Sequence, residues 1–548
     1  MQYEMKHSLT LGGVGLFSVQ PGPNLSFSQM LEHVRERPMD EFMRKFLYEH
    51  MANHRTRKVE KLLAALDEEA DPVLASLLAE SCLYHRRFAH LSERFCGEVV
   101  LRRLAGHSPM IHLRSLLLDD QGLHAAWCAL FDANVAGHQA LPEPESSGLK
   151  APVAEAAMAA ASLAGPGLSE LPVPPPPPPP APEESIPAAE VAAMALQRLE
   201  PLGLFAGLEM RHKACLAPQA LLRSWYVKTR VDNGRHRDTL EGFQTSYGRG
   251  LEEDAARASL YMEIVERVSA FASVSGDKVS KLAGPDQLTF ASQEELLRKG
   301  ENPLDLDELP LEVPYQGQAL WWLPSLQAGP GGYAPCMVPT QFAWMFLNLD
   351  EPALTSGVGS TGLASGLVMD QARRHGLLEC LERDAEAVTP FDPARCFRLT
   401  AEAPRAAALL AMLEEGGVRP VVQDLTGELG VPCYKAFVLG HRGDVNKGTA
   451  AGLSGPRAAM SALTEIPFPF PGPATMDPPA DLPVRALEDL PDHSTGSAAG
   501  DVALLEAALL ARGLSPVYAD LTRTDLELPV VRAIIPGLEM SADFDRFA

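Results

Sequence analysis

Two segments of the chain repeat one pattern, a glycine-rich stretch followed by a helical pattern that contains Glu-x-x-Glu-Arg. The acidic positions are Glu263 and Glu266 in the first segment and Glu379 and Glu382 in the second. Glutamates three residues apart share one face of a helix, so each helix presents a pair of carboxylates. Two such pairs on facing helices would repel each other unless a hard divalent cation such as Mg²⁺ lay between them. The repeated pattern therefore predicts a magnesium site made by these four glutamates.

The glycine-rich stretches predict a phosphate site beside the glutamates. The first contains Gly248, Arg249 and Gly250, and the second contains Ser360 and Gly362. Glycine turns before a helix leave backbone N–H groups free, and a helix N-terminus favours phosphate. Because Mg²⁺ usually completes its octahedron with waters and nucleotide phosphates, we expect a nucleotide here. The alternative is an ordinary solvated helix face with internal ion pairs, but the repetition behind similar glycine stretches favours the site.

The elements that must position these residues follow from the apolar patterns. Helical and strand-like segments alternate from about residue 190 onward, which predicts an α/β (α+β) domain over 189–548, long enough to be internally duplicated. The predicted helices are 255–274, 369–388, 404–415, 456–465 and 499–512, and the predicted strands include 421–425, 433–439 and 530–535. We expect the two acidic helices, 255–274 and 369–388, to face each other within this domain.

The part of the chain before this domain has a different texture. Residues 1–147 carry apolar residues at helical spacing, which predicts a mainly helical domain of unassigned role, opened by a short hairpin that turns at Gly12 and Gly13. Residues 148–188 are rich in Ala and Pro and contain seven consecutive prolines, Pro174 to Pro180. Such a run lacks backbone donors and has a fixed φ, so it predicts a stiff linker. Recognition by a proline-reading domain is the alternative.

Composition excludes several classes of protein. The chain has 548 residues, with 47 Lys and Arg against 71 Asp and Glu, and a formal net charge of −24. Such a field repels polyanions and argues against a nucleic-acid partner. No apolar stretch of about 18 residues is present, so we expect no membrane span. Eight scattered cysteines without a CxxC pair are typical of reduced thiols, which predicts a cytoplasmic protein.

From about 220 to 540 the sequence resembles the YcaO family in several further segments. The stretch Asp424–Lys435 looks like the family's "DLT…GIPV" segment, and Ala459–Glu465 looks like its "ALTEA" helix. The stretch Asp520–Glu539 is similar to the last core strand of the family and the loop after it.

This resemblance implies an ATP-binding fold in which acidic residues hold Mg²⁺ against the phosphates, and it also implies a homodimer. YcaO enzymes use ATP to activate a peptide backbone amide. A nucleophile adds to the amide carbon, and the oxygen is phosphorylated and expelled, which gives azolines, thioamides or amidines. The resemblance implies metal binding by Glu263, Glu266, Glu379, Glu382 and the residue at Gln371, and nucleotide binding by Gly248, Arg249, Gly250, Ser360, Gly362 and Arg383. It leaves the catalytic residue unassigned.

The sequence departs from the family pattern at several positions. Gln371 stands where another metal-binding Glu is common, and an amide oxygen brings no negative charge. Leu367 replaces an Asn, and Arg249 replaces a Lys, which keeps a cation with a different geometry. The usual Gln and Arg positions after Glu465 fall in a proline-rich stretch, so those ATP contacts are in question. The chain also ends without the Pro-x-Pro-x-Pro tail of azoline-forming members, which counts against a standard azoline cyclodehydratase.

Three functions remain open at this point. The first is an ATP- and Mg²⁺-dependent enzyme that activates amides of a peptide or protein substrate for thioamide or azoline formation, together with a partner protein that delivers peptide or sulfur. The second is a nucleotide-binding accessory factor that assists methylthiolation of a ribosomal protein and is not itself catalytic. The third is a scaffold, which predicts no nucleotide binding.

Overall fold

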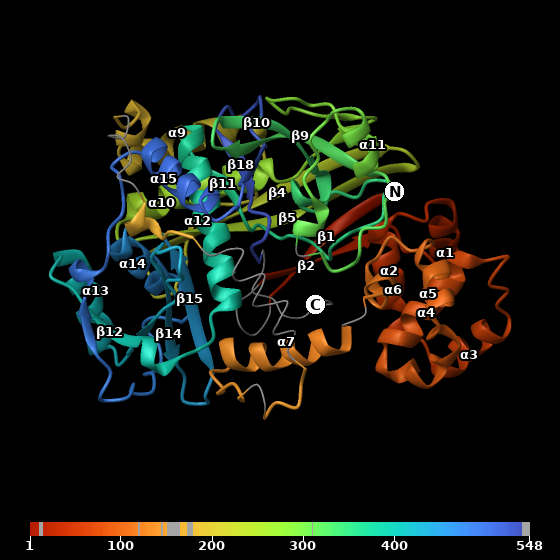
Figure 1. Cartoon of the computed structure of the whole chain (residues 1–548), viewed down its shortest axis with the longest axis horizontal. Coiled ribbons are helices and arrows are strands. Elements are labelled where there is room, and N and C mark those ends of the chain that lie inside the picture. The colour runs from red at the N-terminus through yellow and green to blue at the C-terminus, as the bar shows by residue number, and fades with distance from the viewer. Residues whose placement is uncertain are drawn as a thin grey trace.

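The computed structural model describes residues 1–9, 15–118, 121–143, 146–150, 165–171, 179–309 and 311–539. Figure 1 shows a helical bundle beside a mixed body of sheets and helices, and a separate lobe that carries the strands β12 to β16. The helices of the bundle are α1 Phe27–Glu36, α2 Glu41–Ala52, α3 Thr56–Ala64, α4 Pro72–Tyr84, α5 Glu98–Ala105 and α6 His112–Ser115. The helix α7 (Gln121–Val135) lies between the bundle and that lobe (Figure 1).

The first sheet contains the longest strands of the described chain, in the order β2-β1-β5-β4-β6-β7 with β3 on β4. Its strands are β1 Gln2–Leu9, β2 Gly15–Pro21, β3 Met210–Arg211, β4 Gln219–Asn233, β5 His236–Gly250, β6 Val274–Ser275 and β7 Lys278–Val279. The predicted N-terminal hairpin is confirmed as β1 and β2, although its turn lies outside the described residues. Because β1 pairs in parallel with β5, this hairpin extends a sheet of the later part of the chain.

Two further sheets complete the architecture in the described ranges. The second has the order β10-β9-β17-β18-β11 with β8 on β9, and the third has the order β15-β14-β13-β12-β16. The strands of the second sheet are β8 Thr289–Ala291, β9 Leu320–Gly329, β10 Gly332–Pro339, β11 Leu363–Ser365, β17 Val517–Asp520 and β18 Val530–Ile534. Those of the third are β12 Cys396–Thr400, β13 Val421–Asp424, β14 Cys433–Leu439, β15 Val445–Ala451 and β16 Val484–Ala486.

One strand of each sheet leads along the chain to a helix that packs on that sheet. Helix α10 (Glu253–Ser269) packs on β5, α12 (Met369–Val388) on β11 and β18, and α14 (Gly455–Glu465) on β14 and β15. The other α-helices of the described ranges are α9 Ala188–Leu199, α11 Gln293–Arg298, α13 Pro404–Glu415 and α15 Ala498–Leu510. This mixed architecture with several sheets, next to a helical N-terminal region, confirms the predicted fold class. None of the described helices is long and apolar enough to cross a membrane.

One hydrophobic core joins the helical bundle to the first sheet. Leu47 of α2 and Leu77 of α4 belong to the same buried cluster as Trp225 of β4 and Leu260 of α10. The predicted boundary at residue 147 therefore remains a proposal, with a core shared across it. Most of the proline run lies outside the described residues. Part of the predicted linker does touch the later domain, because Arg512 donates to the carbonyl of Gly165 at 2.7 Å.

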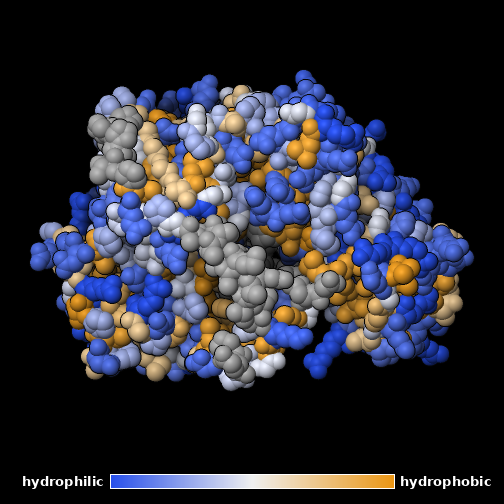
Figure 2. Space-filling view, in the orientation of Figure 1, coloured by the Kyte–Doolittle hydropathy of each residue, from blue (hydrophilic) through white to orange (hydrophobic). Residues whose placement is uncertain are grey.

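The visible surface in Figure 2 is mostly hydrophilic, with apolar residues in small groups. This is the distribution expected of a chain with a formal net charge of −24 and 22% charged residues.

Candidate functional site

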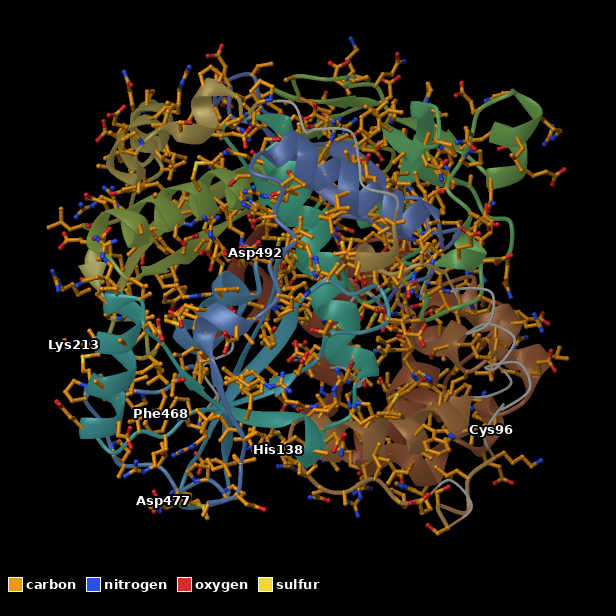
Figure 3. All side chains as sticks on the ribbon, turned by 60° about the vertical axis from the view of Figure 1, so that its left-hand side comes forward. Cys96, His138, Lys213, Phe468, Asp477 and Asp492 are labelled. Carbon is orange, nitrogen blue, oxygen red and sulfur yellow. The ribbon has the colours of Figure 1, made fainter. Side chains whose placement is uncertain are left out.

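Three helices, one packed on each sheet, bring five glutamates together. Glu263 and Glu266 come from α10, Glu379 and Glu382 come from α12, and Glu465 is the last residue of α14. The charges of Glu263 and Glu379 act on Glu266, and the charge of Glu465 acts on Glu263, Glu379 and Glu382. We call these five residues the acidic cluster. Figure 3 labels Asp492, which accepts a hydrogen bond from Ser454 Oγ at 3.0 Å just before α14 begins.

On the α10 side, the cluster is held by one arginine and one backbone amide. The guanidinium of Arg267 lies 3.8 Å from Glu263 Oε1 and 3.6 Å from Glu266 Oε1. The backbone N–H of Tyr247, near the end of β5, donates to Glu263 Oε2 at 3.3 Å. Both carboxylates keep some exposure, 29% for Glu263 and 17% for Glu266, so they line a recess that solvent can enter.

On the α12 side, a ladder of ion pairs runs down the helix. Arg383 donates to Glu382 at 2.6 Å and to the buried Glu386 at 3.0 Å. Glu386 also accepts from Lys447 of β15 at 2.6 Å, and the N–H of Ala451 donates to Glu382 Oε2 at 3.2 Å. Since β15 supplies two of these partners, the third sheet holds the carboxylates of Glu382 and Glu386 in place.

Glu465 was absent from the set of predicted site residues. It forms an ion pair of 2.9 Å with Arg249, which stands between Gly248 and Gly250 at the end of β5. The signal that marks Glu465 in the sequence is the Ala-Leu-Thr-Glu segment at the end of the predicted helix 456–465. The structure thereby connects this end of β5 to the acidic cluster through the side chain of Arg249 and through the backbone N–H of Tyr247.

Burial raises the pKa of the glutamates, and mutual repulsion adds to this effect. The pKa of Glu266 rises to about 8 through burial, with further repulsion from Glu379 and Glu263 against the attraction of neighbouring arginines. Burial also raises the pKa of Glu382 to about 8, with Glu465 and Glu379 nearby. The pKa values of Glu263 and Glu379 are raised for the same reason. A cation that neutralised this cluster would therefore bind with release of protons.

The cluster does not form a closed metal cage. Within the described ranges, no three His, Cys, Asp or Glu side chains converge on one point at metal-binding distance. Mg²⁺ is usually held by only one or two carboxylates, with waters and phosphates as its other ligands. The open arrangement of oxygen donors with raised pKa values therefore fits a nucleotide-bound Mg²⁺ rather than a cation bound by protein alone.

The second glycine-rich stretch forms a loop that a buried arginine holds in place. Arg532 of β18 is fully buried and donates to the carbonyls of Thr361 at 2.5 Å, Gly359 at 2.9 Å and Ala343 at 3.3 Å. Gly362 has a φ of +75°, and a Cβ there would lie 2.1 Å from the carbonyl oxygen of Ala533. Arg532 is a positioning residue that the sequence did not reveal, because its partners lie far from it along the chain.

The prediction of a glycine turn before α10 was wrong. Residues 247–250 are the last residues of β5 and pair with β4. A Cβ at Gly248 would lie 2.1 Å from the carbonyl oxygen of Ala256 and 2.3 Å from the nitrogen of Leu260. Gly248 is therefore required by the close approach of α10 to the strand, and Gly250 is similarly close to Ala255.

Gln371 lies in the first turn of α12, and its side-chain oxygen accepts a hydrogen bond from the N–H of Leu367 at 2.9 Å. The oxygen thus closes the loop that leads into the helix. No contact of the described residues joins Gln371 to the four glutamates of α10 and α12, so metal binding by Gln371 stays a prediction.

A cavity of about 600 Å³ opens beside the acidic cluster. Glu263 and Arg267 line it, together with the loop at Gly359 and Ser360. Its other walls come from β2, from the end of β5, from α2 and from the segment 341–349. The sequence did not predict this cavity, because α2 and the acidic helices are far apart along the chain.

The comparison with protein families decides the identity of this fold. A family model described as YcaO cyclodehydratase, ATP- and Mg²⁺-binding, matches residues 247–467 and 470–539, more than half of the chain. The chain belongs to the YcaO family. The predicted family and the predicted cofactors, ATP and Mg²⁺, are thereby confirmed.

Two related proteins share 28% of their residues with this chain over the aligned part. An uncharacterized protein of Methanothermobacter thermautotrophicus is 28% identical over 336 residues, which cover 55% of this chain and 83% of that protein. An uncharacterized protein from the tfuA 3′ region of Rhizobium leguminosarum bv. trifolii is 28% identical over 249 residues, 41% of this chain and 54% of that protein. A heterocyclase solved in complex with substrate and cofactor has a TM-score of 0.50 at 17% identity. That match covers 67% of this chain and 54% of the heterocyclase, and it shows a shared fold alone.

In this YcaO protein the acidic cluster lies within the part matched by the family, and the bundle α1–α6 lies outside it. Glu263, Glu266, Glu379 and Glu382 gather at one place, as the repeated pattern predicts. Arg383 lies beside Glu382, Arg249 beside Glu465, and Ser360 on the wall of the cavity.

Proposed function

We propose that this YcaO protein uses ATP and Mg²⁺ to activate a backbone amide of a peptide or protein substrate for post-translational modification, with a thioamide or an azoline as the product. The observation that carries the proposal is the convergence of five glutamates, with Arg267 and Arg383 among them, at the meeting point of α10, α12 and α14.

The chemistry requires a phosphoryl group to be transferred to an amide oxygen. A nucleophile adds to the amide carbon, the oxygen gains negative charge and takes the phosphoryl group, and phosphate then leaves. Catalysis of phosphoryl transfer consists mostly of positioning and charge neutralisation, which are the tasks that a rigid set of charged side chains performs. When bound, ATP supplies the phosphoryl group and Mg²⁺ offsets the phosphate charge.

The residues of the chain divide these tasks. The carboxylates of Glu263, Glu266, Glu379 and Glu382 hold the cations, and Arg383 meets phosphate charge from α12. Arg532 holds the loop at residues 359–361 in one shape, so that this loop forms a fixed wall of the site. These roles are part of the proposal and follow from where the side chains lie.

An accessory role in the methylthiolation of a ribosomal protein is the second candidate. The observation that favours it is Gln371, which brings no negative charge and whose oxygen is bonded to the N–H of Leu367. A site with one carboxylate fewer can bind nucleotide yet turn it over poorly. Substrate-stimulated ATP hydrolysis separates the candidates, because only the enzyme requires it.

Partners and location belong to the same proposal. We propose a homodimer that works in the cytoplasm with a protein that delivers peptide or sulfur, without contact to nucleic acid or membrane. Sedimentation of the purified chain tests the homodimer directly, since a monomer at micromolar concentration would contradict it.

The first experiment is calorimetry of ATP binding with and without Mg²⁺. We expect Mg²⁺-dependent binding by the wild type that is lost in Glu379→Gln plus Glu382→Gln. The matched control removes two charges elsewhere, in Glu98→Gln plus Glu294→Gln, whose carboxylates are 69% and 83% exposed. Equal affinity in both double variants would contradict the assignment, and absence of binding by the wild type would favour a scaffold.

A further inference from the structure

The edge of β5 that faces the cavity has an opening in its ladder of hydrogen bonds. The N–H of Thr239 donates to the carbonyl of Met1 at 2.9 Å, and the N–H of Tyr247 donates to Glu263. Backbone groups alternate between the two edges of a strand, so the odd-numbered residues of β5 face this side and the even-numbered ones face β4. Thr245 belongs to the odd set and lines the cavity.

The opening arises because β1 leaves β5 early. β1 pairs with β5 only from Gln2–Met5 to Thr239–Gly242. A Cβ at Gly242 would lie 2.6 Å from the carbonyl oxygen of Met5, so β1 crosses very close to the strand there before it departs. In the described part of the chain, no partner takes the backbone N–H and C=O of Thr245 on this edge.

We propose that this opening receives an extended segment of the peptide substrate, which pairs with Thr245 as an added strand and enters the site from the cavity. An open N–H and an open C=O on one residue match the pair of hydrogen bonds that a peptide residue offers. The inference rests on the proposed function and adds to it how the substrate is held.

The position of the opening connects it to the chemistry. Tyr247 lies two residues farther along β5, roughly 7 Å at the usual rise of a strand, and its N–H meets Glu263. A peptide paired with Thr245 would therefore bring its next backbone amide toward Tyr247 and Glu263, which both line the cavity. Main-chain pairing presents the backbone itself, which is the group that the proposed reaction activates.

The cavity walls fit a peptide better than a polyphosphate. Phe42, Phe271 and Trp344 give an apolar surface that suits a hydrophobic side chain. Among the charged residues of the lining, the carboxylates of Glu41, Glu49, Glu263 and Glu351 outnumber the cations of Lys45 and Arg267. With two cations in this lining, the phosphates of a nucleotide find few positively charged partners along the cavity.

The test uses peptides selected from a random library of short sequences displayed on mRNA, with the full-length protein as bait. A selected peptide is labelled, and its affinity is compared for the wild type, Thr245→Pro and Thr245→Val. Proline removes the open N–H without removing a bond to β4. Valine keeps the backbone N–H and replaces only the hydroxyl, which lies 3.1 Å from Ser224 Oγ, by a methyl group, so it is the matched control.

We expect Thr245→Pro to weaken peptide binding at least tenfold, Thr245→Val to leave it unchanged, and methylation of the peptide amides to weaken binding at every second position. The methylation scan needs only the wild type, so it decides the question even if Thr245→Pro fails to fold. Equal affinity for all three proteins, a methylation scan without alternation, competition by Mg²⁺–ATP or failure to select any peptide would overturn the proposal. If the wild type does not bind Mg²⁺–ATP, the proposed function is overturned instead. The peptide measurements then still show whether a peptide pairs with β5.

Discussion

The affinity for Mg²⁺–ATP should rise steeply with pH, because two of the glutamates that we propose hold the cation are largely protonated in the free protein at neutral pH. The pKa values of Glu266 and Glu382 are about 8, raised by burial and by neighbouring carboxylates. Carboxylates bind metals in their deprotonated form, so binding must release the protons that these groups carry. A raised pKa therefore weakens cation binding at pH values below that pKa and has no effect at pH values well above it.

The magnitude follows from the two pKa values. At pH 7 a carboxyl with a pKa of about 8 is roughly nine-tenths protonated, which weakens binding about tenfold, whereas at pH 9 the penalty is small. Two such groups give a change of about 100-fold between pH 7 and pH 9, or about 2.7 kcal/mol. At pH 8, where each group is half protonated, binding should release about one proton.

Calorimetry in buffers of different ionisation enthalpy measures, in one series, the change of affinity with pH and the number of protons released on binding. Protonation of free ATP is measured in the same buffers and subtracted. Glu266→Gln should flatten the pH dependence to about tenfold, while Glu294→Gln, on the exposed face of α11, should keep the full effect. Less than a threefold change between pH 7 and pH 9, or proton uptake at pH 8, would refute the reasoning.

Three further predictions concern the walls of the site. Arg532→Met leaves three carbonyls without their hydrogen-bond donor, which should destabilise the protein by about 1 to 3 kcal/mol for each carbonyl. The variant should have a lower thermal midpoint and a lower affinity for Mg²⁺–ATP than the wild type, and Arg532→Lys should have intermediate values of both. Gly362→Ala should destabilise the protein by more than about 2 kcal/mol in a thermal-shift comparison, whereas Gly359→Ala, with free space around it, should cost about 1 kcal/mol. Gln371→Glu adds a carboxylate in the first turn of α12 and should strengthen Mg²⁺ binding several-fold by calorimetry; unchanged affinity would separate residue 371 from the cation.

The helices were the most predictable part of the fold. The bounds of α12 and α13, 369–388 and 404–415, agree with the apolar pattern, and the Pro404 that starts α13 marks its first turn. Helix α10 ends at Ser269 rather than at residue 274, because Val274 belongs to β6 and pairs with Val231 of β4.

The glycines were the least predictable part. Local preference places a turn at Gly248 and Gly250, but the pairing of β5 with β4 overrides it. The role of a glycine depends on which part of the chain packs against it, and the backbone of α10 packs against Gly248. A sequence pattern carries no record of that approach.

The sequence by itself determined which glutamates form pairs and that the two members of each pair lie on one helix face. The spacing of Glu263 with Glu266 and of Glu379 with Glu382 is a local property, since helix geometry places side chains with this spacing on one face. The tertiary structure alone decided that these faces meet with Glu465, that Arg532 holds the loop beside them, and that α2 closes a cavity next to Thr245. Those relations join residues that are far apart along the chain, and their distances are set by the packing of sheets and helices rather than by spacing in the sequence.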